Sequence, residues 1–227
     1  MDTRGSCLKI YLHIRDHMDV NTGIMFRTTP NYEIDDRTFV VAGVPRAGTT
    51  SMMRLLEALD IHIDFDNPRN LESKKYSGNF SNICDNPNFP VELLFNDSKW
   101  GTWGFKAHDL SPYHLFYRKI DTYLSMVNNP TIIIPTRDFL SQGIRDQLDN
   151  PKYRIEPLMY NALQKWQKVL EFYISTHLPV CLVSYEKLLT TPRTLGFLLD
   201  WMFGEHSYDH PGFEWLRVDD PRYIDTK

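Results

Sequence analysis

The chain has 227 residues, 42% of them hydrophobic and 13% aromatic, so it can bury a substantial core and is expected to form a single domain over residues 1–227. Its formal net charge of −4 at pH 7 argues against general nucleic-acid binding. The three cysteines show no metal-ligand spacing, and no signal peptide or apolar run of about 18 residues is visible. These features predict a cytoplasmic protein without stable membrane insertion.

Residues 1–37 are expected to form an N-terminal extension. Within it, residues 8–14 alternate apolar and more polar side chains, which suits a half-buried strand. Residues 15–37 are polar and lack a sustained period, so they are predicted to be a loop.

The stretch 39–59 predicts a strand, a phosphate-binding loop and a helix. The run 39–42 is apolar and ends at Gly43, which is typical of a buried parallel strand, and 51–59 is expected to be helical. A glycine-bearing turn into a helix N-terminus presents backbone N–H groups and a positive dipole end to an anion. The candidate anion-binding residues are Pro45, Arg46, Ala47, Gly48, Thr49, Thr50 and Ser51.

The loop departs from the nucleoside triphosphate motif G-x-x-x-x-G-K-[ST] at one position. Gly43 and Gly48 have the spacing of its glycines and Thr50 stands in the Ser/Thr place, but Thr49 replaces the lysine. The missing lysine argues against a P-loop kinase that uses ATP and magnesium, although that enzyme class remains an alternative.

The string Gly-Val-Pro-Arg-Ala-Gly-Thr-Thr at 43–50 closely resembles the 5′-phosphosulfate loop of the sulfotransferases. This resemblance implies the P-loop-like sulfotransferase fold, a three-layer α/β/α arrangement with a mostly parallel central sheet. It also implies the cofactor 3′-phosphoadenosine 5′-phosphosulfate (PAPS), the product 3′,5′-adenosine bisphosphate, and no required metal. A sulfotransferase-like binding protein without turnover is the second alternative.

A short strand is expected at 61–63, followed by a long irregular stretch at 64–100 that is rich in turn formers and aromatic residues. Long loops inside compact domains are often functional, so this stretch is predicted to bind the acceptor, a saccharide or small alcohol. A surface excursion without function is the other interpretation. The oligomeric state cannot be predicted from the sequence.

Trp103 and Phe105 alternate with Gly104 and Lys106 as in a strand, which places Lys106 and His108 at its C-terminal end, and a helix is expected at 111–127. Ligands of open α/β sheets bind at the carboxyl ends of the strands. The pair resembles the sulfotransferase K-x-H motif, which implies that His108 accepts the acceptor's proton while Lys106 and Arg46 stabilise charge at the sulfonyl group.

A carboxylate is the competing candidate for the base. Tyrosylprotein sulfotransferases share the loop string and a Met-Arg pair that is echoed by Met53 and Arg54, and their base is a glutamate about 20 residues after the loop arginine. Asp64 and Asp66 lie near that distance here.

The apolar run 131–135 predicts a buried strand that ends at Arg137, with a helix following to about residue 147. The segment resembles the 3′-phosphate site of sulfotransferases, in which Arg137 matches the arginine. Arg145 stands at the serine position of that motif, and Ser141 lies four residues after Arg137. The alternative for Arg137 is a surface ion pair with Asp138 or Asp146.

The remaining sequence predicts a helix at 156–176 with Trp166 in the core, a strand at 179–183 and a helix from Pro192 to Phe203. The segment at Tyr185 resembles the family's adenine-side motif, which implies that Tyr185 contacts the base; packing beneath the sheet edge is equally consistent. The tail lacks the family's R-K-G string, and Arg217 or Arg222 are candidates to replace it.

Overall fold

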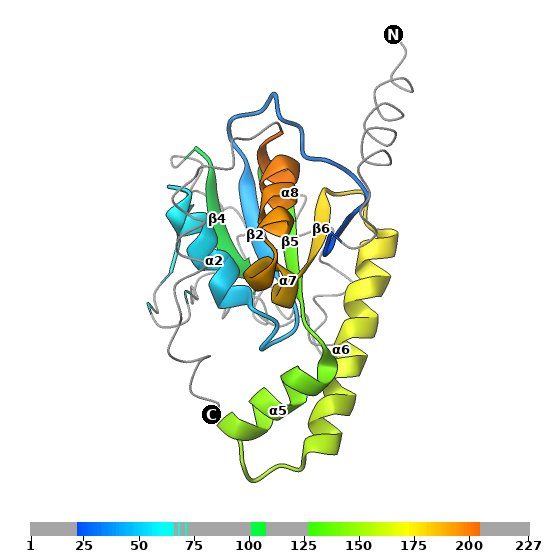
Figure 1. Cartoon of the computed structure of the whole chain (residues 1–227). Coiled ribbons are helices and arrows are strands. Elements are labelled where there is room, and N and C mark those ends of the chain that lie inside the picture. Colours follow the sequence, from blue (N-terminus) through cyan, green and yellow to red (C-terminus); the bar gives the residue numbers. More distant parts are fainter. Residues whose placement is uncertain (1–21, 66–67, 69–70, 72–100, 108–126, 205–227) are drawn as a thin grey trace, which may run out of the picture.

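The structure is a computed structural model that describes residues 22–65, 68, 71, 101–107 and 127–204 (Figure 1). The described strands are β1 (Ile24–Phe26), β2 (Thr38–Ala42), β3 (His62–Ile63), β4 (Trp103–Ala107), β5 (Pro130–Thr136) and β6 (Val180–Ser184). The described helices are α2 (Thr49–Ala58), α5 (Phe139–Asp149), α6 (Ile155–Ser175), α7 (Tyr185–Thr190) and α8 (Pro192–Phe203). The strand predicted at 8–14 lies outside the described residues, as does nearly all of the helix predicted at 111–127.

The described strands form one sheet in the order β1-β6-β5-β2-β4-β3. Strand β1 runs antiparallel to β6, and every other neighbouring pair is parallel. Parallel strands need crossover connections, and α2 and α6 lie in two of them. The predicted α/β class with a mostly parallel sheet is therefore confirmed.

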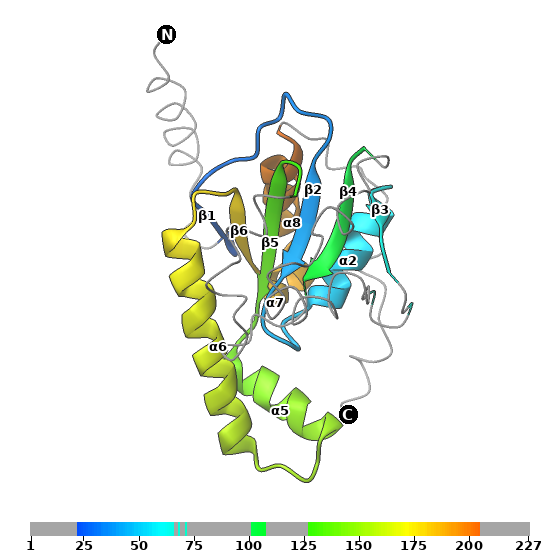
Figure 2. The same ribbon diagram turned by 180° about the vertical axis from the view of Figure 1, so that it is seen from behind.

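Successive residues of the central strands point to opposite faces of the sheet, and helices cover both faces. On one face, Val40 and Ile132 pack with Val169 of α6. On the other, Val41 and Ile133 pack with apolar side chains of α2 and α8. The two opposite views show α2, α7 and α8 on one side of the sheet and α6 on the other (Figures 1 and 2). This is the predicted three-layer arrangement.

Strand β4 is an inner strand of the sheet. It lies between β2 and β3, and all of its residues are buried. Trp103 and Phe105 stack on one face with ring centroids 5.4 Å apart. Gly104 leaves little room on the other face, because a Cβ there would lie 3.1 Å from the Phe39 carbonyl oxygen.

The prediction of a loop throughout residues 15–37 is wrong at β1, which is too short to show a period in the sequence. After β1, residues 27–37 form a segment that we call the N-terminal strap. Arg27 donates a hydrogen bond to the Tyr173 carbonyl in the last turn of α6 at 3.2 Å. The Tyr32 hydroxyl donates to the Trp201 carbonyl near the end of α8 at 2.9 Å.

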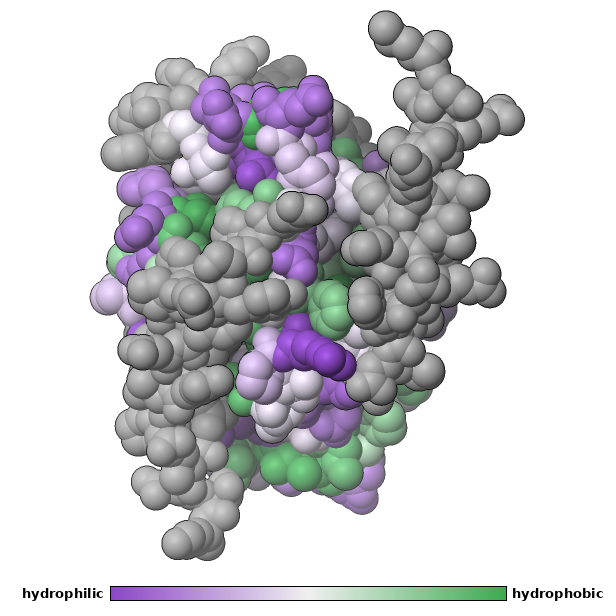
Figure 3. All heavy atoms as spheres, turned by 45° about the horizontal axis from the view of Figure 1, so that its top comes forward, coloured by the Kyte–Doolittle hydropathy of each residue, from purple (hydrophilic) through white to green (hydrophobic). Residues whose placement is uncertain are grey.

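The strap crosses the end of the sheet at which the parallel strands begin. A view that brings this end forward shows hydrophilic residues gathered along the upper border of the described surface (Figure 3). Across the residues placed by the structure, no helix has the combined length and hydropathy of a membrane-spanning segment.

Candidate functional site

The loops after β2 and β5 lie at a point in the sheet where the strand order reverses direction. The chain leaves β2 towards β3 on one side, whereas it leaves β5 towards β6 on the other, although β2 and β5 are neighbours. Such a reversal of direction opens a crevice between the two loops, and ligands of open α/β sheets bind there. One loop holds the predicted anion-binding residues, and the other holds Arg137.

The loop after β2 leads into an N-terminus of α2 that no side chain caps. Its N-cap residue is Gly48, with a φ of 101° that suits glycine. The first-turn N–H groups and the positive end of the helix dipole therefore favour an anion. Thr49 and Ser51 are buried. Of the remaining loop residues, Ala47 is fully buried and Pro45 half-buried.

Lys106 lies beside this helix end. Strand β4 pairs with β2 in register, which brings Lys106 next to Val41 and the start of the loop. Its Nζ atom donates a hydrogen bond to Thr50 Oγ1 at 3.2 Å, and the residue is only 3% exposed. A largely buried ammonium close to a positive helix end creates a strong local potential for a bound anion.

The guanidinium of Arg46 contacts α5 and not the first turn of α2. Its Nε atom lies 3.2 Å from Asp146 Oδ1, and its Nη2 atom forms an ion pair with Asp149. The backbone of Arg46 has a positive φ of 69°. The side chain is 43% exposed, so it can change partners without disturbing the core.

Arg137, in the loop after β5, contacts both the loop after β2 and helix α7. Its Nη1 atom donates to the Arg46 carbonyl at 3.4 Å, and its guanidinium lies 5.4 Å from the ring centroid of Tyr185. Its Nε atom is 3.5 Å from Glu186 Oε1, but this buried nitrogen has no hydrogen bond. The carboxylate paired with Arg137 is thus Glu186, which the sequence analysis did not identify, and not Asp138 or Asp146.

Asp138 caps the N-terminus of α5. Its Oδ1 atom accepts a hydrogen bond from the backbone N–H of Ser141 at 2.7 Å. Burial disfavours the ionised carboxyl, but hydrogen bonds from Ser141 and the Arg137 charge outweigh burial, so the pKa of Asp138 lies below its ordinary value. The N–H of Ser141 is therefore committed to the cap, and Arg145 lies one turn farther along α5.

The ring of Tyr185 packs against the loop after β2 at Gly48. It is 3% exposed, and a Cβ added to Gly48 would lie 2.3 Å from its Cδ2 atom. Its hydroxyl is 3.4 Å from Ser51 Oγ. Of the two roles open for Tyr185 in the sequence, this geometry fits packing beneath the sheet edge.

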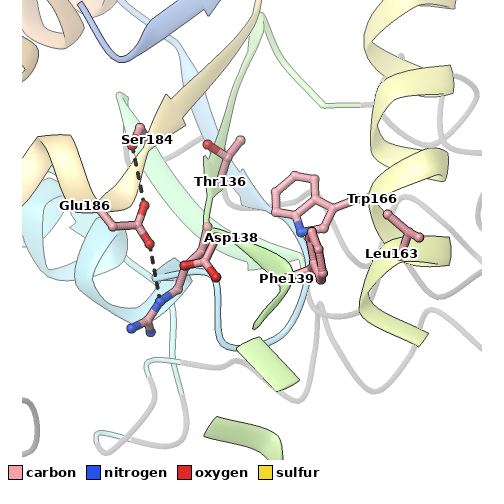
Figure 4. A pocket seen from close by; sticks show the side chains of 8 residues that line it. Thr136, Asp138, Phe139, Leu163, Trp166, Ser184 and Glu186 are labelled. Atoms are coloured by element: carbon pink, nitrogen blue, oxygen red, sulfur yellow. Dashed lines mark hydrogen bonds and ion pairs between the residues drawn. The ribbon is translucent and has the colours of Figure 1, made fainter. Parts of the chain in front are cut away.

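A pocket of ≈ 320 Å³ adjoins Arg137 (Figure 4). Its lining comes from the ends of β5 and β6 and from α5, α6 and α7: Thr136, Arg137, Asp138, Phe139, Leu163, Trp166, Ser184 and Glu186. Trp166, predicted to be a core residue, is half-buried, and its indole N–H donates to Gln142 Oε1 at 2.9 Å. The sequence did not indicate that Trp166 lines this pocket, because the pocket joins elements far apart in the chain.

Several predicted site residues lie outside the described residues: His108, Asp66, Arg217, Arg222 and nearly all of 64–100. Asp64 is described; it follows β3, and its backbone N–H donates to the Gly104 carbonyl at 3.2 Å. No group of three potential metal ligands of the His, Cys, Asp and Glu types occurs in the part of the chain that the structure covers.

A known structure shares this fold. The sulfotransferase domain of the olefin synthase from Synechococcus PCC 7002 aligns with a TM-score of 0.51 and 13% identity, covering 88% of this chain and 83% of that one. Sulfotransferase STF1 from Mycobacterium tuberculosis H37Rv aligns at a TM-score of 0.43 and 15% identity, over 93% of this chain and 74% of that one. No family model and no curated protein sequence matches the chain. The predicted sulfotransferase fold is confirmed.

Proposed function

We propose that this protein is a PAPS-dependent sulfotransferase that transfers a sulfuryl group to a hydroxyl, or less favourably an amine, of an acceptor. The observation that carries the proposal is the uncapped N-terminus of α2 with the Lys106 ammonium beside it. Arg137 supplies a second cation across the same crevice. All of this lies at the carboxyl edge of a sheet whose fold matches that of a sulfotransferase domain.

The residues present fit the three parts of PAPS. The first-turn N–H groups of α2 would hold the 5′-phosphosulfate. Arg137 has a buried Nε atom without a hydrogen bond, and it would hold the 3′-phosphate, with Ser141 or Arg145 completing the site. The neighbouring pocket of ≈ 320 Å³, with Trp166 and Phe139 in its wall, would accept the nucleoside.

When bound, PAPS would supply a sulfuryl group joined to a phosphate through an anhydride oxygen. Lys106, which lies beside Thr50, and the loop N–H groups would stabilise negative charge that develops on the departing 5′-phosphate. His108 is the proposed base. It would take the proton from the acceptor hydroxyl while the oxygen of that hydroxyl forms the new bond to sulfur. If His108→Ala kept near wild-type turnover and PAPS binding, the base would be Asp64 or Asp66.

Titration calorimetry with 3′,5′-adenosine bisphosphate tests the cofactor site. We expect the wild type to bind it and Arg137→Ala to lose about 10- to 100-fold in affinity, because a charge-assisted contact disappears. Arg46→Ala should also weaken binding. Arg154→Ala is the matched control, since Arg154 is highly exposed and pairs with Glu156 on α6. Binding of magnesium-ATP without the bisphosphate would instead favour the kinase alternative.

A transfer assay separates the enzyme from a binding protein of the same fold. The assay would offer PAPS with hydroxyl acceptors, first saccharides and small alcohols, which the stretch 64–100 is proposed to recognise. Product formation that Lys106→Met abolishes would support catalysis. Tight bisphosphate binding without transfer across a broad acceptor panel would support the binding protein.

A further inference from the structure

Arg46 stands between two opposing sources of charge. Its backbone belongs to the loop that leads to the positive N-terminal end of α2. Its guanidinium, however, lies at the C-terminal end of α5. Asp146 and Asp149 belong to the last turn of α5, where the peptide dipoles add negative potential. The cation of the anion-binding loop is therefore held by negative groups on both its Nε and its Nη2 atoms.

These two nitrogens are the fork with which an arginine binds a phosphate or sulfonate group in bidentate fashion. In this structure each of them contacts a different carboxylate, Nε that of Asp146 and Nη2 that of Asp149. An anion at the loop and the carboxylates of α5 consequently need the same donors. The two carboxylates also add negative charge beside the loop, which opposes an approaching polyanion.

The ion pairs are arranged so that they can exchange. The side chains are 43% exposed for Arg46, 29% for Asp146 and 42% for Asp149. Ion pairs at such exposure stabilise a protein little, so breaking them for a more highly charged ligand costs little. The Arg46 carbonyl stays held by Arg137 Nη1 at 3.4 Å, and the side chain can therefore swing while the loop backbone keeps its place.

We propose that Asp146 and Asp149 are positioning residues that compete with the bound cofactor for Arg46 and thereby set its affinity. This inference rests on the function proposed above. Cofactor binding draws the guanidinium from α5 to the loop, and the carboxylates take it back as the bisphosphate leaves. They act through Arg46 and do not contact the reacting atoms.

The test measures the Kd of 3′,5′-adenosine bisphosphate and its dissociation rate in Asp146→Asn, Asp149→Asn and the double variant. Asparagine keeps the size of the side chain and removes the charge. We expect the double variant to bind about tenfold more tightly and to release the ligand more slowly, with the gain shrinking as salt increases. A side chain with a merely structural role would not raise affinity when it is altered.

The matched control removes two carboxylates elsewhere. Glu156 and Glu171 are exposed residues of α6 that pair with Arg154 and Lys168. The double variant Glu156→Gln/Glu171→Gln changes the net charge equally and should alter the Kd by less than about twofold. Repeating the Asp146/Asp149 series with Arg46→Ala should abolish most of the gain, because the competition requires the guanidinium.

The outcomes separate this inference from the function on which it rests. If the wild type binds the bisphosphate and the double aspartate variant binds equally or more weakly, the competition is refuted and the proposed function stands. If the aspartate variants gained the same affinity in the Arg46→Ala background, the competition would also be refuted. The gain would then come from removing negative charge near the ligand and not from releasing Arg46. If neither the wild type nor any variant binds, the proposed function and this inference fail together.

Discussion

The loop after β2 and the loop after β5 face each other across one crevice, but they acquire their form in different ways. The first is shaped by its own residues, since Gly48 provides the positive φ and α2 provides the N–H groups. The second depends on distant residues, since Arg137 is placed by Glu186 and the ring of Tyr185. Local sequence can therefore specify an anion-binding turn, whereas the orientation of a cation beside it is a tertiary property.

Among the substitutions at or beside the loop after β2, Lys106→Met should lower activity the most. Methionine keeps most of the buried volume but removes the ammonium next to Thr50. We expect kcat/KM for sulfuryl transfer to fall by about 100- to 1,000-fold, because charge on the leaving group loses its stabilisation. Steady-state kinetics measure the change, and circular dichroism checks the fold. A loss below about threefold would remove Lys106 from the mechanism.

Gly48→Ala should destabilise the contact between this loop and α7. The new Cβ would lie 2.3 Å from the Tyr185 ring, at a φ of 101° that alanine rarely adopts. We expect the free energy of unfolding to fall by about 2–4 kcal/mol, measured by urea denaturation, and bisphosphate binding to weaken.

Gly101→Ala is the matched control for Gly48→Ala. Gly101 also has a positive φ, of 64°, but the nearest atom to its Cβ would be Asp36 Oδ1 at 3.6 Å. This variant should lose only about 1 kcal/mol, because it suffers the backbone strain without the collision. Equal losses in the two variants would show that the ring of Tyr185 does not confine the loop.

Asp138→Ala should have the smallest effect and belongs to the second loop. Loss of the α5 cap is expected to lower the free energy of unfolding by about 1 kcal/mol at neutral pH. Because the folded-state pKa of Asp138 is lowered, its contribution is present above the ordinary aspartate pKa and is lost as the pH falls through the folded-state value.

Denaturation curves at several pH values check this behaviour. The stability difference between wild type and Asp138→Ala should shrink below about pH 4. A difference that stayed constant down to that pH would mean that the cap does not depend on the charge. Asp138→Asn, which can still accept the Ser141 hydrogen bond, should lose less stability than Asp138→Ala.

The sequence predicted the elements that have strong local signals. The apolar runs before Gly43 and Arg137 became β2 and β5, and the turn between β2 and α2 was located to within a residue or two. Strand β1 was missed because three residues show no period, and α7 because its six residues follow a strand directly. The charge pairs of the site were also missed, since Asp149 and Glu186 reach Arg46 and Arg137 only after the sheet and its helices pack.

The N-terminal strap has a consequence for how the molecule would come apart. It binds the C-terminal end of α6 on one face of the sheet and that of α8 on the other. A protease cut within 27–37 should release both ends in one event, so that slowly exchanging amides on opposite faces are lost together in a hydrogen-exchange experiment. The strap thus holds the two helix ends together at the edge of the sheet where the parallel strands begin. The loops that would move during ligand exchange lie at the opposite, carboxyl edge.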